Sequence, residues 1–452
     1  MKIKSLLIIN RGEIALRILR TCKALGIKTV LAVSEADKES LPAQLADQVV
    51  VLGPANSQKS YLNIPIIITT ARAVGVDAIH PGYGFLSEVP ALAKACEENG
   101  IIYVGPKPEH IEKMGNKLVA RSLAKECGVP ILSGSEKVNS VDEIVKIVKQ
   151  IGLPVMLKAA AGGGGRGMKI VTDESQIQST FESASAEALS AFGDSSMYVE
   201  RYIANARHIE IQVLGDSYGN VIHLGERDCS TQRRHQKLVE EATAPLISEQ
   251  LREEIRQSAV KLAQSMNYQS AGTVEYIVDQ DAGTFYFLEM NTRIQVEHPV
   301  TEMITNVDLI EEQIHVANGE PLRYSQEDIL IRGHAIEVRI NAEEPNEGFR
   351  PTPGVITKWQ IPQGPGVRVD SHCYQGYKVP IFYDSMIGKL IVLGNDRDHA
   401  IRRMLAALDE FKVEGISTTI PFLKEVLSSE QFRSGKVNTK LVENIMNARQ
   451  LV

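Results

Sequence analysis

Five polar side chains alternate with other residues in the stretch EMNTRIQVE, which spans positions 289 to 297. They are Glu289, Asn291, Arg293, Gln295 and Glu297. On an extended backbone this alternation would place all five on one face and leave the intervening residues for a core. That face would offer oxygen ligands for a metal, a guanidinium for an anion and a spare carboxylate. The stretch therefore predicts a site for a metal-bound nucleotide beside a small anion, although a solvated β-ribbon would show the same alternation.

A glycine run lies directly after a strand-like segment. Lys158 closes the apolar run PVMLK, and the residues AAAGGGGRGM follow it. Glycines have no Cβ, so backbone amides in such a loop can approach phosphate oxygens, and Arg166 adds a cation. No GK[ST] ending follows, so the segment is not a Walker A loop. It predicts a phosphate-binding loop, with a flexible surface loop as the alternative.

Three further segments carry polar groups with more than one interpretation. The segment DCSTQRRHQK concentrates donors, namely Gln232, Arg233, Arg234, His235 and Lys237. It could form a second wall of an anion pocket or be a solvated run of charge. Arg339 stands among apolar residues in HAIEVRI and should pair with a carboxylate or an anionic intermediate, so a structural ion pair and catalysis both stay open. HPGYGFLSE, around Tyr83, indicates by itself only a turn with an aromatic residue.

The elements that must position these groups fall into three regions. Over residues 1 to 115, short apolar runs alternate with helical patterns, which is typical of a Rossmann-like parallel sheet with helical crossovers. The first run is followed by NRGEIA rather than GxGxxG, which argues against dinucleotide binding there. Residues 116 to 320 form the second region, with a mobile lid at about 130–204, and residues 321 to 452 form the third.

The second region contains a hairpin that could build a cation site. Strands are expected in ARHIEIQVLGD and NVIHLGERDC, followed by a helix at about 249 to 266 and the hairpin GTVEYIVDQDAGTFYFLEMN. Folding this hairpin near Asp281 should bring Glu275 opposite or nearly opposite Glu289. The two carboxylates would then be close enough to share a cation.

Composition excludes several other classes of protein. The chain has 452 residues, 43% of them hydrophobic, and a net charge of -7, which predicts about three globular domains and no nucleic-acid partner. Its five cysteines are scattered without a CxxC pair and are expected to be reduced. Asn10, Arg11 and Glu13 cut the first apolar run too short for a signal peptide, and no later run has the length of a membrane span. We expect a cytoplasmic protein without a membrane partner.

The chain resembles biotin carboxylase, the ATP-grasp component of biotin-dependent carboxylases, in the segments NRGEIALRILR, HPGYGFLSE, KAAAGGGGRGM, RDCSTQRRHQK, EMNTRIQVEHPVTEMIT and RINAEEP. The resemblance covers essentially the whole chain. It implies a multidomain α/β and α+β fold with an N-terminal Rossmann-like biotin carboxylase domain, an ATP-grasp core with a lid, and a C-terminal biotin carboxylase domain.

The resemblance also implies site residues. ATP would contact Lys117, Lys158, Gly164, Gly165, Glu200, Arg201, Tyr202, Ile203, His208, Gln232, His235, Glu275 and Glu289. Mg²⁺ or Mn²⁺ would be held by Glu275, Glu289 and Asn291, a set of oxygen ligands that suits a hard cation. Bicarbonate would bind Lys237, Arg293, Gln295 and the Val296 backbone, and biotin would bind Arg339 and Tyr83. The implied catalytic residues are Lys237, Arg293, Glu297 and Arg339.

The implied chemistry is the ATP-dependent carboxylation of biotin. Glu297 would act as a general base while bicarbonate attacks the γ-phosphate, which gives carboxyphosphate. Carboxyphosphate would yield carbon dioxide and phosphate, the phosphate would take the biotin N1′ proton, and Arg339 would stabilise the biotin enolate. A closed lid would keep water away from the intermediate.

The resemblance leaves the final acyl acceptor open. Acetyl-CoA carboxylase of fatty acid synthesis is the first expectation, while pyruvate, 2-oxoglutarate and other acyl-CoA carboxylases use similar chains. The chain lacks an AMKM-type biotinylation site, so biotin should arrive on a separate carrier protein, with carboxyltransferase subunits and a second copy of the chain as further partners. The competing hypotheses are another bicarbonate-activating ATP-grasp ligase, as in carbamoyl phosphate synthesis, and a catalytically silent subunit.

Overall fold

The N-terminal part of the chain forms a parallel sheet. The computed structural model describes residues 2–135, 137–160 and 167–449. Five parallel strands are ordered β3-β2-β1-β4-β5, as the alternation of apolar runs and helices predicted. They are β1 (Ser5–Ile8), β2 (Lys28–Ser34), β3 (Gln48–Gly53), β4 (Ala78–His80) and β5 (Ile102–Tyr103). The helices of this part are α1 (Gly12–Ala24), α2 (Leu41–Leu45), α3 (Ile64–Val74) and α4 (Pro90–Glu98).

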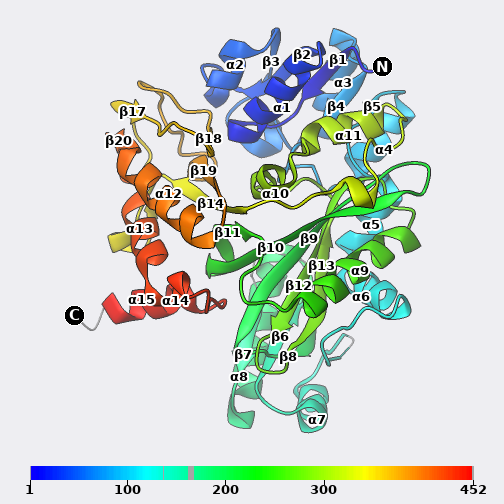
Figure 1. Cartoon of the computed structure of the whole chain (residues 1–452). Helices are drawn as coiled ribbons and strands as arrows, with labels where there is room; N and C mark the ends of the chain where they lie inside the picture. The colour runs from blue at the N-terminus through cyan, green and yellow to red at the C-terminus, as the bar shows by residue number, and fades with distance from the viewer. Residues whose placement is uncertain (1, 136, 161–166, 450–452) are drawn as a thin grey trace.

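An antiparallel sheet of eight strands crosses the middle of the molecule and continues into the C-terminal part (Figure 1). Its order is β13-β12-β9-β10-β11-β14-β19-β18. The strands are β9 (Ala206–Gly215), β10 (Val221–Arg233), β11 (Gln236–Ala242), β12 (Ser270–Asp279), β13 (Thr284–Asn291), β14 (His334–Asn341), β18 (Val367–Asp370) and β19 (Met386–Gly394). The pairing of β11 with β14 thus joins segments on both sides of the boundary expected near residue 321.

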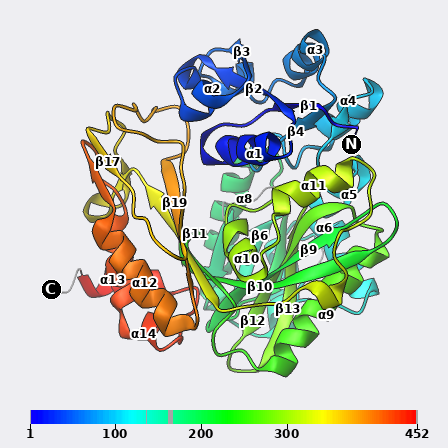
Figure 2. The same ribbon diagram turned by 45° about the horizontal axis from the view of Figure 1, so that its top comes forward.

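Helices border this sheet and connect it to the N-terminal part. They are α5 (Pro108–Gly115), α6 (Lys117–Glu126), α9 (Glu249–Ser265), α10 (His298–Thr305) and α11 (Leu309–Ala317). Figure 2 shows α10 and α11 between the N-terminal sheet and the long central strands. Buried residues of α11 share one hydrophobic core with α1. The N-terminal sheet is therefore packed onto the central sheet rather than tethered by a linker.

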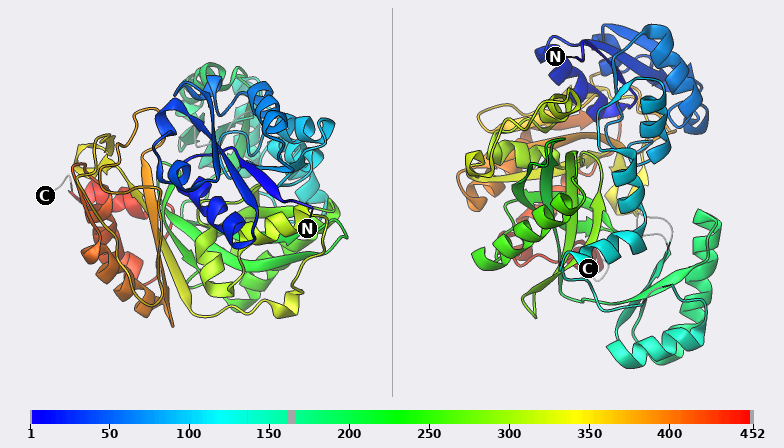
Figure 3. Two further views of the ribbon diagram at one scale, coloured as in Figure 1. Left: turned by 90° about the horizontal axis from the view of Figure 1, so that it is seen from above. Right: turned by 90° about the vertical axis from the view of Figure 1, so that its right-hand side faces the viewer.

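A small unit projects from the body of the molecule (Figure 3, right). It contains α7 (Val141–Ile151), α8 (Ile177–Phe192) and the antiparallel strands β6 (Val155–Ala159), β7 (Met168–Val171) and β8 (Met197–Arg201) in the order β7-β6-β8. These elements lie within the range of about 130–204 that was assigned to a lid from the sequence. Its own core, which includes Ile144, Leu157 and Val199, is separate from that of the central sheet.

The C-terminal part packs helices against β14 and β19. It contains α12 (Arg397–Glu410), α13 (Ile420–Ser428), α14 (Glu430–Arg433) and α15 (Leu441–Arg449), with β15 (Glu343–Glu344) paired to β16 (Arg350–Pro351) and β17 (Lys358–Gln360) paired to β20 (Lys412–Glu414). All five cysteines are free thiols, and all but Cys127 are buried. Among the described helices, none is long and apolar enough to cross a membrane.

Candidate functional site

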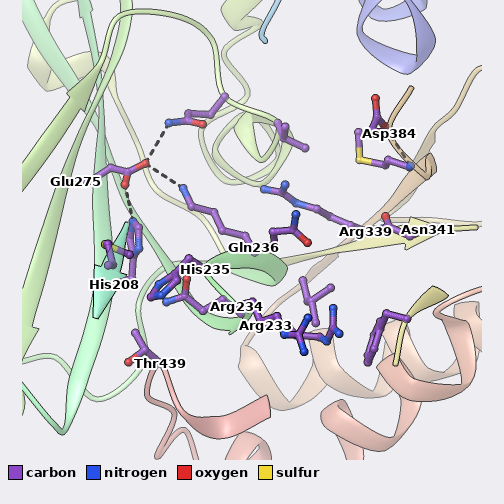
Figure 4. Close-up of a pocket in the computed structure, with 18 of the residues that line it drawn as sticks. His208, Arg233, Arg234, His235, Gln236, Glu275, Arg339, Asn341, Asp384 and Thr439 are labelled. Atoms are coloured by element: carbon purple, nitrogen blue, oxygen red, sulfur yellow. Dashed lines mark hydrogen bonds and ion pairs between the residues drawn. The ribbon is translucent and has the colours of Figure 1, made fainter. Parts of the chain in front are cut away.

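A large cavity opens between the lid, the central sheet and the N-terminal part. Its volume is about 1960 Å³, and its lining draws on strands β9 to β14, on the lid strands and on α15. Figure 4 shows His208 and Glu275 at one end of the drawn pocket and Arg339, Asn341 and Asp384 at the other. The hairpin of β10 and β11, which carries Arg233 to Gln236 at its turn, runs between these two ends. One cavity therefore contains most of the residues that the sequence singled out.

The paired carboxylates lie where the hairpin prediction placed them. Glu275 of β12 is the direct cross-strand partner of Glu289 of β13. Asn291 donates a 2.9 Å hydrogen bond to Glu275, while Glu289 faces the cavity with 38% of its side chain exposed and the Lys117 ammonium 4.0 Å away. Burial raises the pKa of Glu289, and the charge of Glu275 raises it further. Two adjacent carboxylates that resist joint ionisation fit the binding of a hard cation.

Two other groups of potential metal ligands are already satisfied. The ligand atoms of His208, Glu210 and Glu275 lie within 4.8 Å of one another, as do those of Glu210, Cys229 and Glu297. Each group contains at least two carboxylates that are bonded to the Lys237 ammonium. That ammonium supplies the positive charge that a metal would otherwise bring. The Glu275–Glu289 pair is the better cation site because Glu289 remains open to the cavity.

Lys237 forms the centre of the charge cluster. Its Nζ atom lies 2.6 Å from Glu210, 3.1 Å from Glu275 and 2.6 Å from Glu297. Burial alone would lower the pKa of Lys237, but these three carboxylates raise it well above its usual value. Glu210 is shared with Arg227, whose Nε lies 2.6 Å away. The ammonium is thus permanently charged and held at the wall of the cavity.

Arg339 connects the cluster to the opposite end of the cavity. Its Nε donates to Glu240 over 2.7 Å, and its Nη2 donates to Glu297 over 2.9 Å. The sequence left open whether Arg339 is an ion-pair partner or a reacting group, and the geometry allows both because 18% of its side chain is still exposed. Burial would raise the pKa of Glu297, but Lys237 and then Arg339 hold it well below its usual value.

Arg293 is fixed by neighbours on both sides. Its Nε lies 2.9 Å from Glu88, and its Nη1 donates to the Gln295 side chain over 2.7 Å. Its Nη2 donates to Asn291 over 3.1 Å. Glu88 belongs to the segment HPGYGFLSE, whose sequence indicated only a turn. That segment therefore contributes a carboxylate that orients the guanidinium beside the cation site.

The expectation of an extended backbone throughout positions 289 to 297 is wrong. Strand β13 ends at Asn291, and Glu297 has φ -82° and ψ 11° where it precedes α10, a helix with Pro299 in its first turn. Proline fixes its own φ and favours the start of a helix, so the chain turns here instead of continuing the pleat. Arg293, Gln295 and Val296 still line the cavity, whereas Glu297 is buried behind it with 0% exposure.

The lid contributes further charged groups to the cavity. Lys158 on β6 lies 2.5 Å from Glu200 on β8, and Glu200 also pairs with Arg121 of α6. Burial would lower the pKa of Lys158, but the charge of Glu200 raises it. The predicted nucleotide contacts that line the same cavity are Lys117, Lys158, Glu200, Arg201, Tyr202, Ile203, His208, Gln232, His235, Glu275 and Glu289. Gly164 and Gly165 lie outside the described residues.

The sequence prediction missed several buried carboxylates around these residues. Glu210 and Glu240 have 0% exposure and hold Lys237 and Arg339 in place. A third buried carboxylate is Glu13 of α1. Tyr83 lines the cavity, and its hydroxyl donates a hydrogen bond to Glu13. A strand with charged residues at alternate positions, such as RHIEIQ around Glu210, was the only signal in the sequence.

Comparison with known proteins agrees with this geometry. Residues 2–111 match the model for the biotin carboxylase N-terminal domain, residues 116–325 the model for the ATP binding domain of the carbamoyl-phosphate synthase L chain, and residues 337–444 the model for the biotin carboxylase C-terminal domain. The chain is 53% identical over 442 residues to biotin carboxylase 1 of Bacillus subtilis, covering 98% of each chain. It is 52% identical to a pyruvate carboxylase subunit from Methanothermobacter thermautotrophicus, covering 97% of this chain and 89% of that one.

Solved structures give the same result. The biotin carboxylase of Campylobacter jejuni superposes with a TM-score of 0.95 at 49% identity, covering 98% of this chain and 99% of that one. The biotin carboxylase domain of the Hydrogenobacter thermophilus 2-oxoglutarate carboxylase superposes with a TM-score of 0.94 at 48% identity, covering 98% of both chains. That domain was crystallised as a dimer with MgADP, ADP and bicarbonate.

The fold and the site define an ATP-grasp enzyme. A three-stranded lid stands over a central antiparallel sheet, and the neighbouring strands β12 and β13 of that sheet carry the paired carboxylates. The family within this class is identified by three matching domain models and by relatives that are at least 50% identical over nearly the whole chain. The chain belongs to the biotin carboxylase family and is an ATP-dependent ligase of a biotin-dependent carboxylase.

Proposed function

We propose that this enzyme is the biotin carboxylase subunit of an acetyl-CoA carboxylase and carboxylates biotin on a separate carrier protein in the cytoplasm. Its cofactors are ATP and Mg²⁺, and carrier-bound biotin is its substrate. One observation carries the proposal most directly: Glu297 is clamped between Lys237 and Arg339, and both of these line the cavity that also holds the Glu275–Glu289 pair. A base, an anion site and a cation site therefore lie side by side.

The nucleotide end of the cavity would use cations and oxygen ligands together. Lys117 and Lys158 would neutralise phosphate oxygens, and the segment from Glu200 to Ile203 would contact the base. Glu275, Glu289 and Asn291 would hold Mg²⁺, which would supply charge neutralisation at the transferring phosphate. Since the Asn291 amide nitrogen now faces Glu275, that side chain would have to reorient to present its oxygen.

The anion end would hold bicarbonate between Lys237 and Arg293, with Gln295 and the Val296 backbone beside it. Glu297 is 2.6 Å from Lys237 and would accept the bicarbonate proton as a bicarbonate oxygen attacks the γ-phosphate. Glu88 already orients the Arg293 side chain before the anion binds, so little side-chain freedom is lost on binding. On the far side, Arg339 and Tyr83 would receive the ureido ring of biotin, and Arg339 would stabilise the enolate.

The positions of these residues suggest different roles for the regions of the chain. We assign residues 1–115 and 321–452 to the biotin side and the framework, and residues 116–320, with the lid at about 130–204, to the nucleotide. A homodimer and an association with carboxyltransferase subunits are part of the same proposal. The dimeric crystal form of the Hydrogenobacter relative supports the first, and the names of the Bacillus subtilis relative and others like it support a stand-alone subunit.

The direct test is phosphate release from Mg-ATP by the purified protein, with bicarbonate present, as free biotin is titrated. Stimulation by biotin that requires bicarbonate is expected. Hydrolysis that needs bicarbonate but ignores both biotin and a biotinylated carrier would instead favour another bicarbonate-activating ligase.

The acceptor needs a separate experiment. An extract of the source cells is depleted of this chain with an antibody and then supplemented with the purified protein. Fixation of labelled bicarbonate is measured with acetyl-CoA, pyruvate or 2-oxoglutarate. Restoration with acetyl-CoA is expected, and restoration only with one of the two acids would refute the acetyl-CoA assignment.

A further inference from the structure

A fully buried lysine lies behind the reacting groups and has no part in the function proposed so far. Lys389 is on β19, its side chain is 0% exposed, and it is the cross-strand partner of Arg339. Its Nζ atom donates to the Val296 carbonyl over 2.6 Å and lies 3.0 Å from Glu13. Burying an ammonium is costly unless it is paired and hydrogen bonded, so this position needs a compensating reason.

The contact with Val296 fixes the backbone of the next residue. The Val296 carbonyl belongs to the peptide plane that it shares with the Glu297 amide, so a bond to that oxygen sets the orientation of the plane. Glu297 directly precedes α10 and has the non-helical ψ of 11°. At this corner the backbone must hold the Glu297 carboxylate between Lys237 and Arg339.

The contact with Glu13 leads to the other side of the cavity. Glu13 lies on α1 and accepts a hydrogen bond from the Tyr83 hydroxyl through the same oxygen that faces Lys389. One ammonium therefore supports the Glu297 corner and, through one carboxylate, the Tyr83 hydroxyl. The two supported groups come from the segment before α10 and from the loop after β4, and Glu13 of α1 links the second one to Lys389.

The charge around Lys389 exceeds what a simple ion pair requires. Glu337 and Asp370 also act on it, in addition to Glu13. Neither carboxyl oxygen of Glu337 has a hydrogen-bond partner among the described residues. Burial raises the pKa of Glu337 well above its usual value, and the nearby charges of Glu240 and Glu297 raise it further. Among the described residues, Glu13 is the carboxylate that lies within ion-pair distance of the ammonium.

We propose that Lys389 is a positioning residue for biotin carboxylation, which holds Glu297 through the Val296 carbonyl and Tyr83 through Glu13. This inference rests on the proposed roles of Glu297 and Tyr83. Lys389 itself touches neither nucleotide nor biotin, because it is not part of the cavity lining. Its loss would misplace the base without removing any group that binds ATP.

The test compares Lys389→Met with the double variant Lys389→Met/Glu13→Gln. A displacement of about 1 Å can cost about 100-fold, so a decrease in kcat of about that size is expected for Lys389→Met in bicarbonate-dependent phosphate release, with and without biotin. The KM for ATP should stay within about twofold of the wild type, whereas the KM for biotin should rise. A surface lysine, Lys358 paired with Glu414 over 3.0 Å, provides the matched control as Lys358→Met.

The double variant separates positioning from stability. It removes both charges of the pair, and glutamine at position 13 can still accept a hydrogen bond from the Tyr83 hydroxyl, so the melting temperature should return toward that of the wild type. The decrease in kcat should remain. Recovery of kcat together with the melting temperature would overturn the proposal, as would an unchanged kcat in Lys389→Met. Absence of biotin-stimulated activity in the wild type would instead refute the proposed function, independently of Lys389.

Discussion

Replacing Arg339 by methionine should separate the two halves of the reaction. Methionine keeps the apolar stem but removes the bonds to Glu240 and Glu297, of 2.7 and 2.9 Å. The Nη1 atom makes no hydrogen bond within the part of the chain that the structure describes, so it is the donor available to a ligand. A hydrogen bond from a charged donor contributes about 1.5–3 kcal/mol, and loss of one electrostatic stabiliser of a transition state costs about 10²–10³ in kcat.

Biotin-dependent phosphate release should therefore fall by about 10²–10³. Biotin-independent release needs Glu297 but not the enolate, and Lys237 still holds Glu297 over 2.6 Å. We expect this slower activity to fall only about tenfold, because one of the two ion-pair partners that hold the Glu297 carboxylate in position is lost.

The assay is steady-state phosphate release at saturating Mg-ATP and bicarbonate, with and without biotin. Arg339→Lys keeps the charge but loses the second donor, so its rates should lie between those of the wild type and Arg339→Met. The exposed Arg332, mutated to methionine, controls for the loss of an arginine. An equal decrease of both activities in Arg339→Met would refute a specific role of Arg339 on the biotin side.

Two further predictions concern the carboxylates. Glu289→Gln should raise the Mg²⁺ concentration for half-maximal activity about tenfold. Burial and the charge of Glu275 raise the pKa of Glu289. Without metal, ionisation of Glu289 therefore destabilises the folded protein at pH values above the usual titration range of glutamate. Because glutamine does not ionise, the variant should melt no lower than the wild type at pH 8 in EDTA. An unchanged Mg²⁺ requirement would contradict the hairpin assignment. Burial raises the pKa of Glu240 to about 7, so the folded protein binds this proton more tightly than the unfolded chain and loses that stability as the pH rises from about 4.5 to about 7. Glu240→Gln should flatten this part of the stability profile in urea unfolding at pH 5 and pH 8, and an unaltered slope would show that Glu240 does not titrate there.

Local patterns in the sequence were sufficient for elements that depend on neighbouring residues. The hairpin register that pairs Glu275 with Glu289 follows from one turn and two alternating strands. The alternation beyond Asn291 gave a wrong expectation because strand β13 ends there and the chain turns into α10, so the same residue spacing lies in a turn. A period of two predicts a face only while the chain remains a strand.

Long-range pairing was not predictable in the same way. Glu240 and Arg339 meet because β11 pairs with β14 in one register, and no local pattern selects that pairing. Lys389 and Glu13 lie near opposite ends of the chain, and neither belongs to a motif in the sequence that indicates a buried charge. A role for these buried charges can be inferred only from the fold, which shows the carboxylates and carbonyls that lie within hydrogen-bond distance of them.

The clamp on Glu297 links the strength of the base to the presence of its substrate. Lys237 and Arg339 outweigh the effect of burial and hold its pKa well below the usual value, and a carboxylate with so low a pKa accepts a proton poorly near neutral pH. In the proposed function, an anion between Lys237 and Arg293 draws part of the Lys237 charge away from Glu297. The pKa of Glu297 then rises, because opposite charge at a carboxylate is what lowers it. The anion also supplies the proton to be removed, so in the proposed function the base meets its proton donor only when bicarbonate is in place.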